Sequence, residues 1–384
     1  MSPLRIAMIG QRGVPATFGG IEHHVEELGA RLAARGHEVI VYCRTNYAAD
    51  RPPSFRGMRL RHLPTLSRKH LDAIVHSALS SVDAALRRVD VVHYHAVGPG
   101  IPAILPRYLS PSKVVLTVHG LDAERAKWGP AARAVLRTAT WMSARVPDAT
   151  IVVSRALAEH YRARYRRVTT YIPNGVERPG PHPPRLITER FGFRGGDYVL
   201  FVGRLVPEKA PDLLIRAFRE IPTDHRLVLA GGSSFTGDYV RSLQALAEDD
   251  PRVLMPGYMY GELLQELYAN ASAFVLPSLL EGLPLTLLEA ASHGTPVVVS
   301  DIAPHLEVVG ADGPGHRVFP RGDRAALVRA LRLALDGGAT ERRGAEELRE
   351  RVLDTYRWEA VVEATEAVYR SCLGRTQGSF ARSS

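Results

Sequence analysis

The chain has 384 residues, of which 45% are hydrophobic and 23% charged, and its formal net charge is +9. This length and composition indicate a folded protein of two domains and exclude collagen-like, low-complexity and disordered chains. The charge is uneven, since residues 1–185 hold 27 Lys and Arg against 13 Asp and Glu while the remainder is acidic, so the basic half could face an anionic membrane, an anionic substrate or nucleic acid.

Short apolar runs alternate with amphipathic helical stretches along the first half of the chain. Strands are predicted at residues 4–9, 38–43, 89–95, 113–118, 150–153 and 170–173, and helices at 21–35, 71–87 and 154–165. Alternation of this kind indicates an α/β domain with a parallel sheet. We therefore predict a first Rossmann-like domain over residues 1–178.

A proline-rich stretch follows, and its four prolines block regular pairing, so a linker is predicted at residues 179–186. A second alternation then gives strands at 198–202, 226–230, 253–255, 273–277 and 296–300, and helices at 210–220, 238–248, 261–269, 285–292, 324–335 and 358–373. This predicts a second Rossmann-like domain over residues 187–357. Two such domains facing a cleft would hold ligands at the carboxyl ends of their strands.

Redox and targeting features point to the cytoplasm. Cys43 and Cys372 form no Cys-x-x-Cys pair, so neither a disulfide framework nor a structural zinc site is expected. The first apolar run is too short for a signal peptide, and no stretch of about eighteen uncharged apolar residues occurs. We expect a cytoplasmic protein that does not span a membrane.

A glycine-rich loop runs from Gly10 to Gly20 between the first strand and the first helix. Free amides and the helix dipole at such a position favour an anion. The loop matches neither the G-x-G-x-x-G pattern nor the P-loop pattern, which argues against a dinucleotide-binding enzyme and against a P-loop NTPase. Gly19 and Gly20 are candidate phosphate contacts, and a plain glycine-rich turn is the alternative.

Charged residues stand after two predicted strands of the second domain. Arg204 and Lys209 could clamp both phosphates of a pyrophosphate, the alternative being two solvated surface cations. Glu281 and Glu289 are eight residues apart, just over two helical turns, so both carboxylates can face one ligand. The second domain therefore carries the candidate site for a phosphorylated, hydroxyl-rich ligand.

Histidines stand at the ends of two strands of the first domain. His93 and His95 share one face and could bind a metal, but no third ligand stands at a sensible spacing, which favours packing or acceptor-side roles. His119 ends the next strand, where a structural role is the default. Because the chain also lacks an Asp-x-Asp triplet, we predict no metal cofactor and expect Arg204 and Lys209 to neutralise the charge of a phosphorylated ligand.

The candidate residues occur in an order that resembles the retaining family-four glycosyltransferases of the GT-B fold: Gly19-Gly20, then Arg204 with Lys209, then Glu281-x7-Glu289. The run from Ile9 to Glu22 is similar to the opening of a bacterial rhamnosyltransferase-like subgroup. The resemblance covers nearly the whole chain. It implies that a final helix at about 358–374 crosses back onto the first domain.

The resemblance also implies a reaction, the transfer of a hexose or deoxyhexose from a nucleotide-sugar to an acceptor hydroxyl with retention at the anomeric carbon. Arg204 and Lys209 would hold the donor's diphosphate, Glu281 the transferred sugar and Glu289 the ribose hydroxyls, while His119 would lie near an outer hydroxyl of the sugar. Backbone amides of one loop would meet phosphate and sugar, namely those of Gly282, Leu283, Pro284 and Leu285. Pro284 replaces a glycine that is frequent in the family, which removes one N–H donor.

The implied acceptor is lipid-linked or another glycan, used in cell-surface polysaccharide or glycolipid synthesis. The basic first domain is expected to dock on an anionic membrane at the inner face of the plasma membrane. A nucleotide-sugar epimerase, a phosphorylase, a non-catalytic regulator and a nucleic-acid binder stay open as alternatives. The four intact charged residues argue against a regulator, and the lack of interleaved basic and aromatic residues argues against nucleic acid.

Overall fold

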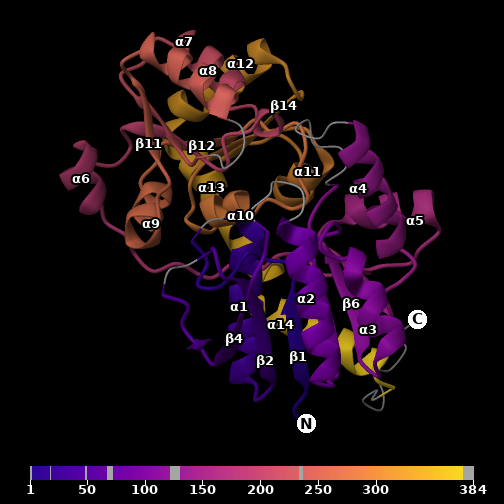
Figure 1. Ribbon diagram of the computed structural model, residues 1–384. Coiled ribbons are helices and arrows are strands. Elements are labelled where there is room, and N and C mark those ends of the chain that lie inside the picture. Colours follow the sequence, from indigo (N-terminus) through magenta and orange to yellow (C-terminus); the bar gives the residue numbers. More distant parts are fainter. Residues whose placement is uncertain are drawn as a thin grey trace, which may run out of the picture. The chain divides into compact units, whose positions relative to one another are not determined.

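The computed structural model describes residues 2–17, 19–47, 50–66, 72–121, 130–232 and 237–374. Contacts divide these residues into two compact units (Figure 1). Unit 1 holds the described residues up to 174 together with 358–374, and unit 2 holds those from 175 to 357. Within the described ranges, no helix combines the length and the apolar character that a membrane crossing requires.

Unit 1 is built on an eight-stranded sheet with the order β3-β4-β2-β1-β5-β6-β7-β8. Its neighbouring strands are parallel except for the short β3–β4 pair. The strands are β1 Arg5–Ile9, β2 Glu38–Arg44, β3 Ser54–Phe55, β4 Met58–Leu63, β5 Val91–His95, β6 Lys113–Val118, β7 Ala149–Val152 and β8 Thr170–Tyr171. Because β1 pairs with β2 on one side and with β5 on the other, the strand order reverses at β1, where such sheets bind ligands.

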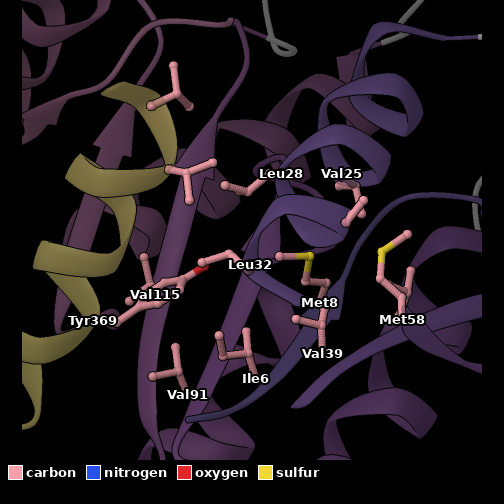
Figure 2. Packing of buried hydrophobic residues seen from close by; sticks show 14 of the residues in the cluster. Ile6, Met8, Val25, Leu28, Leu32, Val39, Met58, Val91, Val115 and Tyr369 are labelled. Carbon is pink, nitrogen blue, oxygen red and sulfur yellow. The ribbon is translucent and has the colours of Figure 1, made fainter. Parts of the chain in front are cut away.

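Six α-helices accompany this sheet in the part of the chain that the structure describes: α1 Gly20–Ala34, α2 Asp72–Leu86, α3 Ile104–Leu109, α4 Pro130–Ser143, α5 Arg155–Tyr165 and α14 Trp358–Cys372. Figure 2 shows the core between sheet and helices, with Tyr369 of α14 beside Val115 of β6 and Met58 of β4 on the opposite flank. The last helix therefore contributes to the core of the first unit.

Unit 2 is built on a six-stranded, fully parallel sheet with the order β11-β10-β9-β12-β13-β14. Its strands are β9 Tyr198–Val202, β10 Arg226–Ala230, β11 Val253–Gly257, β12 Ala273–Leu276, β13 Val297–Ser300 and β14 His316–Phe319. Its α-helices are α6 Leu186–Phe191, α7 Pro211–Arg219, α8 Gly237–Glu248, α9 Gly261–Ala269, α10 Leu285–Ser292, α11 Ala303–Val309, α12 Arg324–Asp336 and α13 Gly338–Thr355. The order reverses at β9, so the predicted pair of Rossmann-like parallel sheets is confirmed.

The stretch predicted as a linker contains no helix or strand until α6 begins at Leu186. The two passages of the chain at the ends of unit 2 pair with each other, because Val176 bridges Arg357 and its N–H donates to the Tyr356 carbonyl at 2.7 Å. Unit 2 thus begins and ends at one place.

Candidate active site

The cation loop of unit 2 follows β9, the strand at which the sheet order reverses. From Gly203 the chain passes Arg204, makes a single 3-10 turn over Pro207–Lys209 and starts α7 at Pro211. The backbone of β10 approaches closely, since a Cβ on Gly231 would lie 1.8 Å from the Gly203 carbonyl oxygen. Only glycine can stand at that position, and the approach holds two strand-end loops together.

Lys209 and Glu281 form an ion pair in unit 2, with the ammonium 2.5 Å from the carboxylate. Glu281 lies on the loop after β12, the neighbour of β9, and accepts a second hydrogen bond from the Ser278 hydroxyl at 2.7 Å. Their side chains are only 12% and 10% exposed. Burial raises the pKa of the Glu281 carboxyl, but the charges of Lys209 and His305 and the hydrogen bonds outweigh it, so the net pKa is lowered. The site holds an ionised carboxylate beside a cation.

Glu289 stands on α10 and is held by Tyr268 of α9, whose hydroxyl donates to it at 2.8 Å. Burial and the nearby Glu289 charge raise the pKa of Tyr268 well above its ordinary value, so the phenol keeps its proton. The loop from Gly282 to Pro284 is buried and leads into α10 at Leu285. Structure thus places both candidate carboxylates on one loop and the helix that follows it.

The glycine-rich loop of unit 1 is stabilised by carboxylates of α1. Glu22 accepts from the Arg12 N–H at 3.1 Å, and Glu26 accepts from the Ala16 N–H at 2.6 Å. Gly19 has a φ of 103°, and a Cβ there would lie 2.2 Å from Glu22 Oε2, so this position requires glycine. Gly20 is the first residue of α1. Two backbone N–H groups of the loop therefore already donate hydrogen bonds to carboxylates of the protein itself.

Three histidines come together at the carboxyl ends of β5 and β6. His119 Nε2 lies 3.3 Å from His95 Nδ1, and the His119 ring centroid is 4.8 Å from that of His24 on α1. Sequence spacing indicated no third ligand beside His93 and His95, whereas the fold brings His24 and His119 next to His95. We missed His24 in the sequence. The available signal was its place one turn into the helix that follows β1.

His93 has a different environment from the other three histidines. Its ring nitrogens bond the Tyr369 hydroxyl at 2.6 Å and the Thr117 hydroxyl at 2.7 Å, which assigns it to packing. Burial lowers the pKa of His93 and of His119 to about 3, and burial also lowers the pKa of His24 and His95 well below the ordinary value. All four imidazoles are therefore neutral at pH 7.

Comparison with known proteins decides the family. The model described as Glycosyltransferase Family 4 matches residues 18–178, and the one described as Glycosyl transferases group 1 matches residues 188–351. A D-inositol 3-phosphate glycosyltransferase of Acidothermus cellulolyticus is 30% identical over 97% of this chain and 91% of that protein. The chain belongs to glycosyltransferase family 4. It is a nucleotide-sugar-dependent retaining glycosyltransferase.

Solved structures show that this family-4 glycosyltransferase has the GT-B fold. Sucrose-phosphate synthase from Thermosynechococcus elongatus matches with a TM-score of 0.83 and 24% identity, covering 97% of this chain and 100% of that one. HepE from Anabaena, in complex with UDP and glucose, matches with a TM-score of 0.81 and 17% identity, covering 96% and 100%. At these identities the likeness establishes the fold.

The transferase also has a basic cavity of about 1020 Å³ in unit 1. Its wall comes from α4, α5 and the adjoining turns, and it includes the half-exposed Trp141 together with five arginines: Arg133, Arg137, Arg145, Arg164 and Arg166. The basic stretch that ends at Arg167 was visible in the sequence, whereas α4 was not predicted. The basic residues Arg125 and Lys127 lie outside the described residues.

Proposed function

We propose that this transferase moves a hexose or deoxyhexose from a nucleotide-sugar to a hydroxyl of a lipid-linked or other glycan acceptor, without a metal cofactor. The observation that carries the donor side is the cation loop at the end of β9, where Lys209 pairs with Glu281 and Arg204 stands five residues earlier. A pair of fixed cations can neutralise a leaving diphosphate as a metal ion would.

The proposed reaction exchanges one bond at the anomeric carbon. The bond from that carbon to the phosphate oxygen breaks as the bond to the acceptor oxygen forms on the same face, and the acceptor proton passes to the departing phosphate. Arg204 and Lys209 stabilise the charge that gathers on the diphosphate. In this proposal Glu281 holds the sugar, next to the Lys209 ammonium with which its carboxylate pairs.

Two further roles complete the donor side of the proposal. Glu289 accepts from ribose hydroxyls, with Tyr268 holding the carboxylate in place. His119, a neutral imidazole at the end of β6, bonds an outer hydroxyl of the sugar. Gly19 and Gly20 let the backbone approach the donor.

The acceptor side rests on the arginine cavity of unit 1. Arg137, Arg145, Arg164 and Arg166 are exposed and form no ion pair with any described residue. Each basic side chain near an anionic leaflet contributes about 1 kcal/mol, and salt screens the attraction. This face therefore suits docking on an anionic membrane that presents a lipid-linked acceptor of polysaccharide or glycolipid synthesis.

A screen of nucleotide-sugars tests the donor side. One donor is expected to raise the melting temperature and to be hydrolysed slowly without acceptor, and Arg204→Ala should lose both effects. The proposal is contradicted if no nucleotide-sugar and no nucleoside diphosphate raises the melting temperature of the protein.

Co-sedimentation with phosphatidylglycerol-containing vesicles tests the acceptor side. Binding is expected at low salt and release at high salt, and Arg137→Glu with Arg164→Glu should abolish it. The double variant Arg342→Glu with Arg343→Glu, which changes two exposed arginines of unit 2 by the same charge, should bind like the wild type. Equal loss in both double variants, or no binding at low salt, contradicts docking through the cavity.

A further inference from the structure

The three histidines of unit 1 belong to three different elements that meet at one edge of the sheet. His24 is on α1, His95 ends β5 and His119 follows β6. One ring nitrogen from each lies within 4.8 Å of the others. His24 and His95 are fully buried, while His119 is partly exposed and gives the group a side open to solvent.

Two nitrogens of this group already have a metal-like separation. Two nitrogens on one tetrahedral Zn²⁺, each at about 2.0–2.1 Å from the ion, lie about 3.3–3.4 Å apart. His95 Nδ1 and His119 Nε2 are 3.3 Å apart and form a hydrogen bond, which a bound ion would replace. The third nitrogen, within 4.8 Å, needs an imidazole rotation to close, and the torsion that turns the ring has broad minima.

Hydrogen bonding within the group leaves buried nitrogens unsatisfied. Among the described atoms, Nδ1 of His24 has no hydrogen-bond partner. Nε2 of His95 also has none, but it is not the nitrogen that faces His119. An orphaned buried polar atom is costly and calls for a water or an ion.

A second layer of residues holds this group in place. The His93 ring packs on His95 with centroids 4.1 Å apart and is itself fixed by Tyr369 and Thr117. Trp358 of α14 packs beside His24 with ring centroids 5.7 Å apart. These ring contacts restrict the orientation of the His24 and His95 imidazoles.

We propose that His24, His95 and His119 form a binding site for Zn²⁺ or a similar divalent transition-metal ion. The ion takes one nitrogen from each histidine and keeps its fourth position for water. The ion also inhibits transfer, because it occupies the His119 nitrogen that would bond the sugar. This inhibitory role rests on the proposed function. Chelation then relieves inhibition and removes no cofactor.

Cobalt and zinc titrations of the chelator-stripped full chain test the site directly. One equivalent of Co²⁺ is expected to give the intense visible absorption of a four-coordinate ion, Zn²⁺ should displace it, and Zn²⁺ should raise the melting temperature. Wild-type protein that shows neither the absorption nor the thermal shift overturns the proposal, whatever the variants do.

Histidine variants identify the ligands. His24→Gln and His95→Gln are each expected to weaken Co²⁺ binding by about 100-fold, whereas the matched control His160→Gln, elsewhere in unit 1, keeps it. Equal affinity in all three folded variants overturns the ligand assignment. Binding needs no donor, so the site and the proposed transfer can fail separately. In a turnover assay Zn²⁺ should inhibit the wild type and spare His24→Gln, and equal inhibition of both overturns the inhibitory role.

Discussion

Lys209 and Glu281 act as one unit at the scale of single residues. Both side chains are nearly buried, and the carboxylate has Lys209 and Ser278 as its hydrogen-bond donors. Such a pair holds a cation ready for phosphate without an external metal, and it makes each partner responsible for the solvation of the other. Catalytic and structural effects of mutations here must therefore be measured separately.

Replacing Lys209 should cost both activity and stability. Lys209→Ala removes a charge that meets the leaving diphosphate, with a loss on the order of 10²-fold in turnover, and it leaves a buried carboxylate unpaired, which costs about 3 kcal/mol. Urea unfolding and steady-state turnover measure the two effects. The double variant Lys209→Ala with Glu281→Gln should recover much of the stability and none of the turnover. An unchanged unfolding midpoint in Lys209→Ala would show that the pair does not form.

The two glutamates should separate by kinetic signature. Glu281→Gln is expected to lower turnover more than donor affinity, because its partner is the sugar whose charge changes during reaction. Glu289→Gln should weaken the donor and the free nucleoside diphosphate alike. Titrations of both ligands together with turnover measurements test this. Tyr268→Phe removes the hydroxyl that donates a hydrogen bond to Glu289, so it should weaken binding of the same ligands as Glu289→Gln, but less. Identical profiles for the two glutamate variants contradict the division.

At the scale of elements, local sequence patterns correctly predicted helices and strands that have a clear local signal. The helix predicted after Ser154 is α5, and the Ser154 hydroxyl accepts from the Leu157 N–H as its cap. The missed strand β4 had a weak local signal, because its burial alternates only over its first residues. The helix α4, which begins at Pro130, was also missed. The Lys209–Glu281 pair was beyond local patterns, because it joins residues 72 positions apart.

The final helix α14 links the core of unit 1 to the histidine group. Tyr369→Phe removes the hydroxyl that bonds the buried His93, at a cost of about 1–2 kcal/mol, and should weaken Co²⁺ binding by about 10-fold. Tyr94→Phe is the matched control, since Tyr94 bonds Ser81 at the same 2.6 Å distance. It should lower stability and leave Co²⁺ affinity unchanged. Equal Co²⁺ affinity in both variants would refute the supporting role of α14.

At the scale of the whole molecule, acid should destabilise unit 1. His24, His93, His95 and His119 have folded pKa values below the ordinary 6.5, so the unfolded chain binds more protons between these values. The contribution of the neutral imidazoles to the free energy of unfolding is therefore complete above about pH 6.5 and is lost as the pH falls. At pH 5 His93 and His119, with folded pKa values of about 3, each cost up to about 2 kcal/mol.

Tryptophan fluorescence can follow this unfolding selectively, because residues 175–357 contain no tryptophan. The urea midpoint measured by fluorescence should be much lower at pH 5 than at pH 7.5. In His93→Gln the difference between the two midpoints should be smaller. A midpoint independent of pH over this range would mean that the histidines are not held neutral.

We propose that protein cations, and not a metal, hold the donor's diphosphate. Calorimetric titration of the nucleoside diphosphate of the identified donor, in excess EDTA, tests it most directly with wild-type protein and Arg204→Ala. We predict metal-free binding by the wild type and affinity about 100-fold lower in Arg204→Ala, a difference of about 2.7 kcal/mol. Binding that requires Mg²⁺, or equal affinity of the two proteins in EDTA, would show that these cations do not hold the diphosphate by themselves.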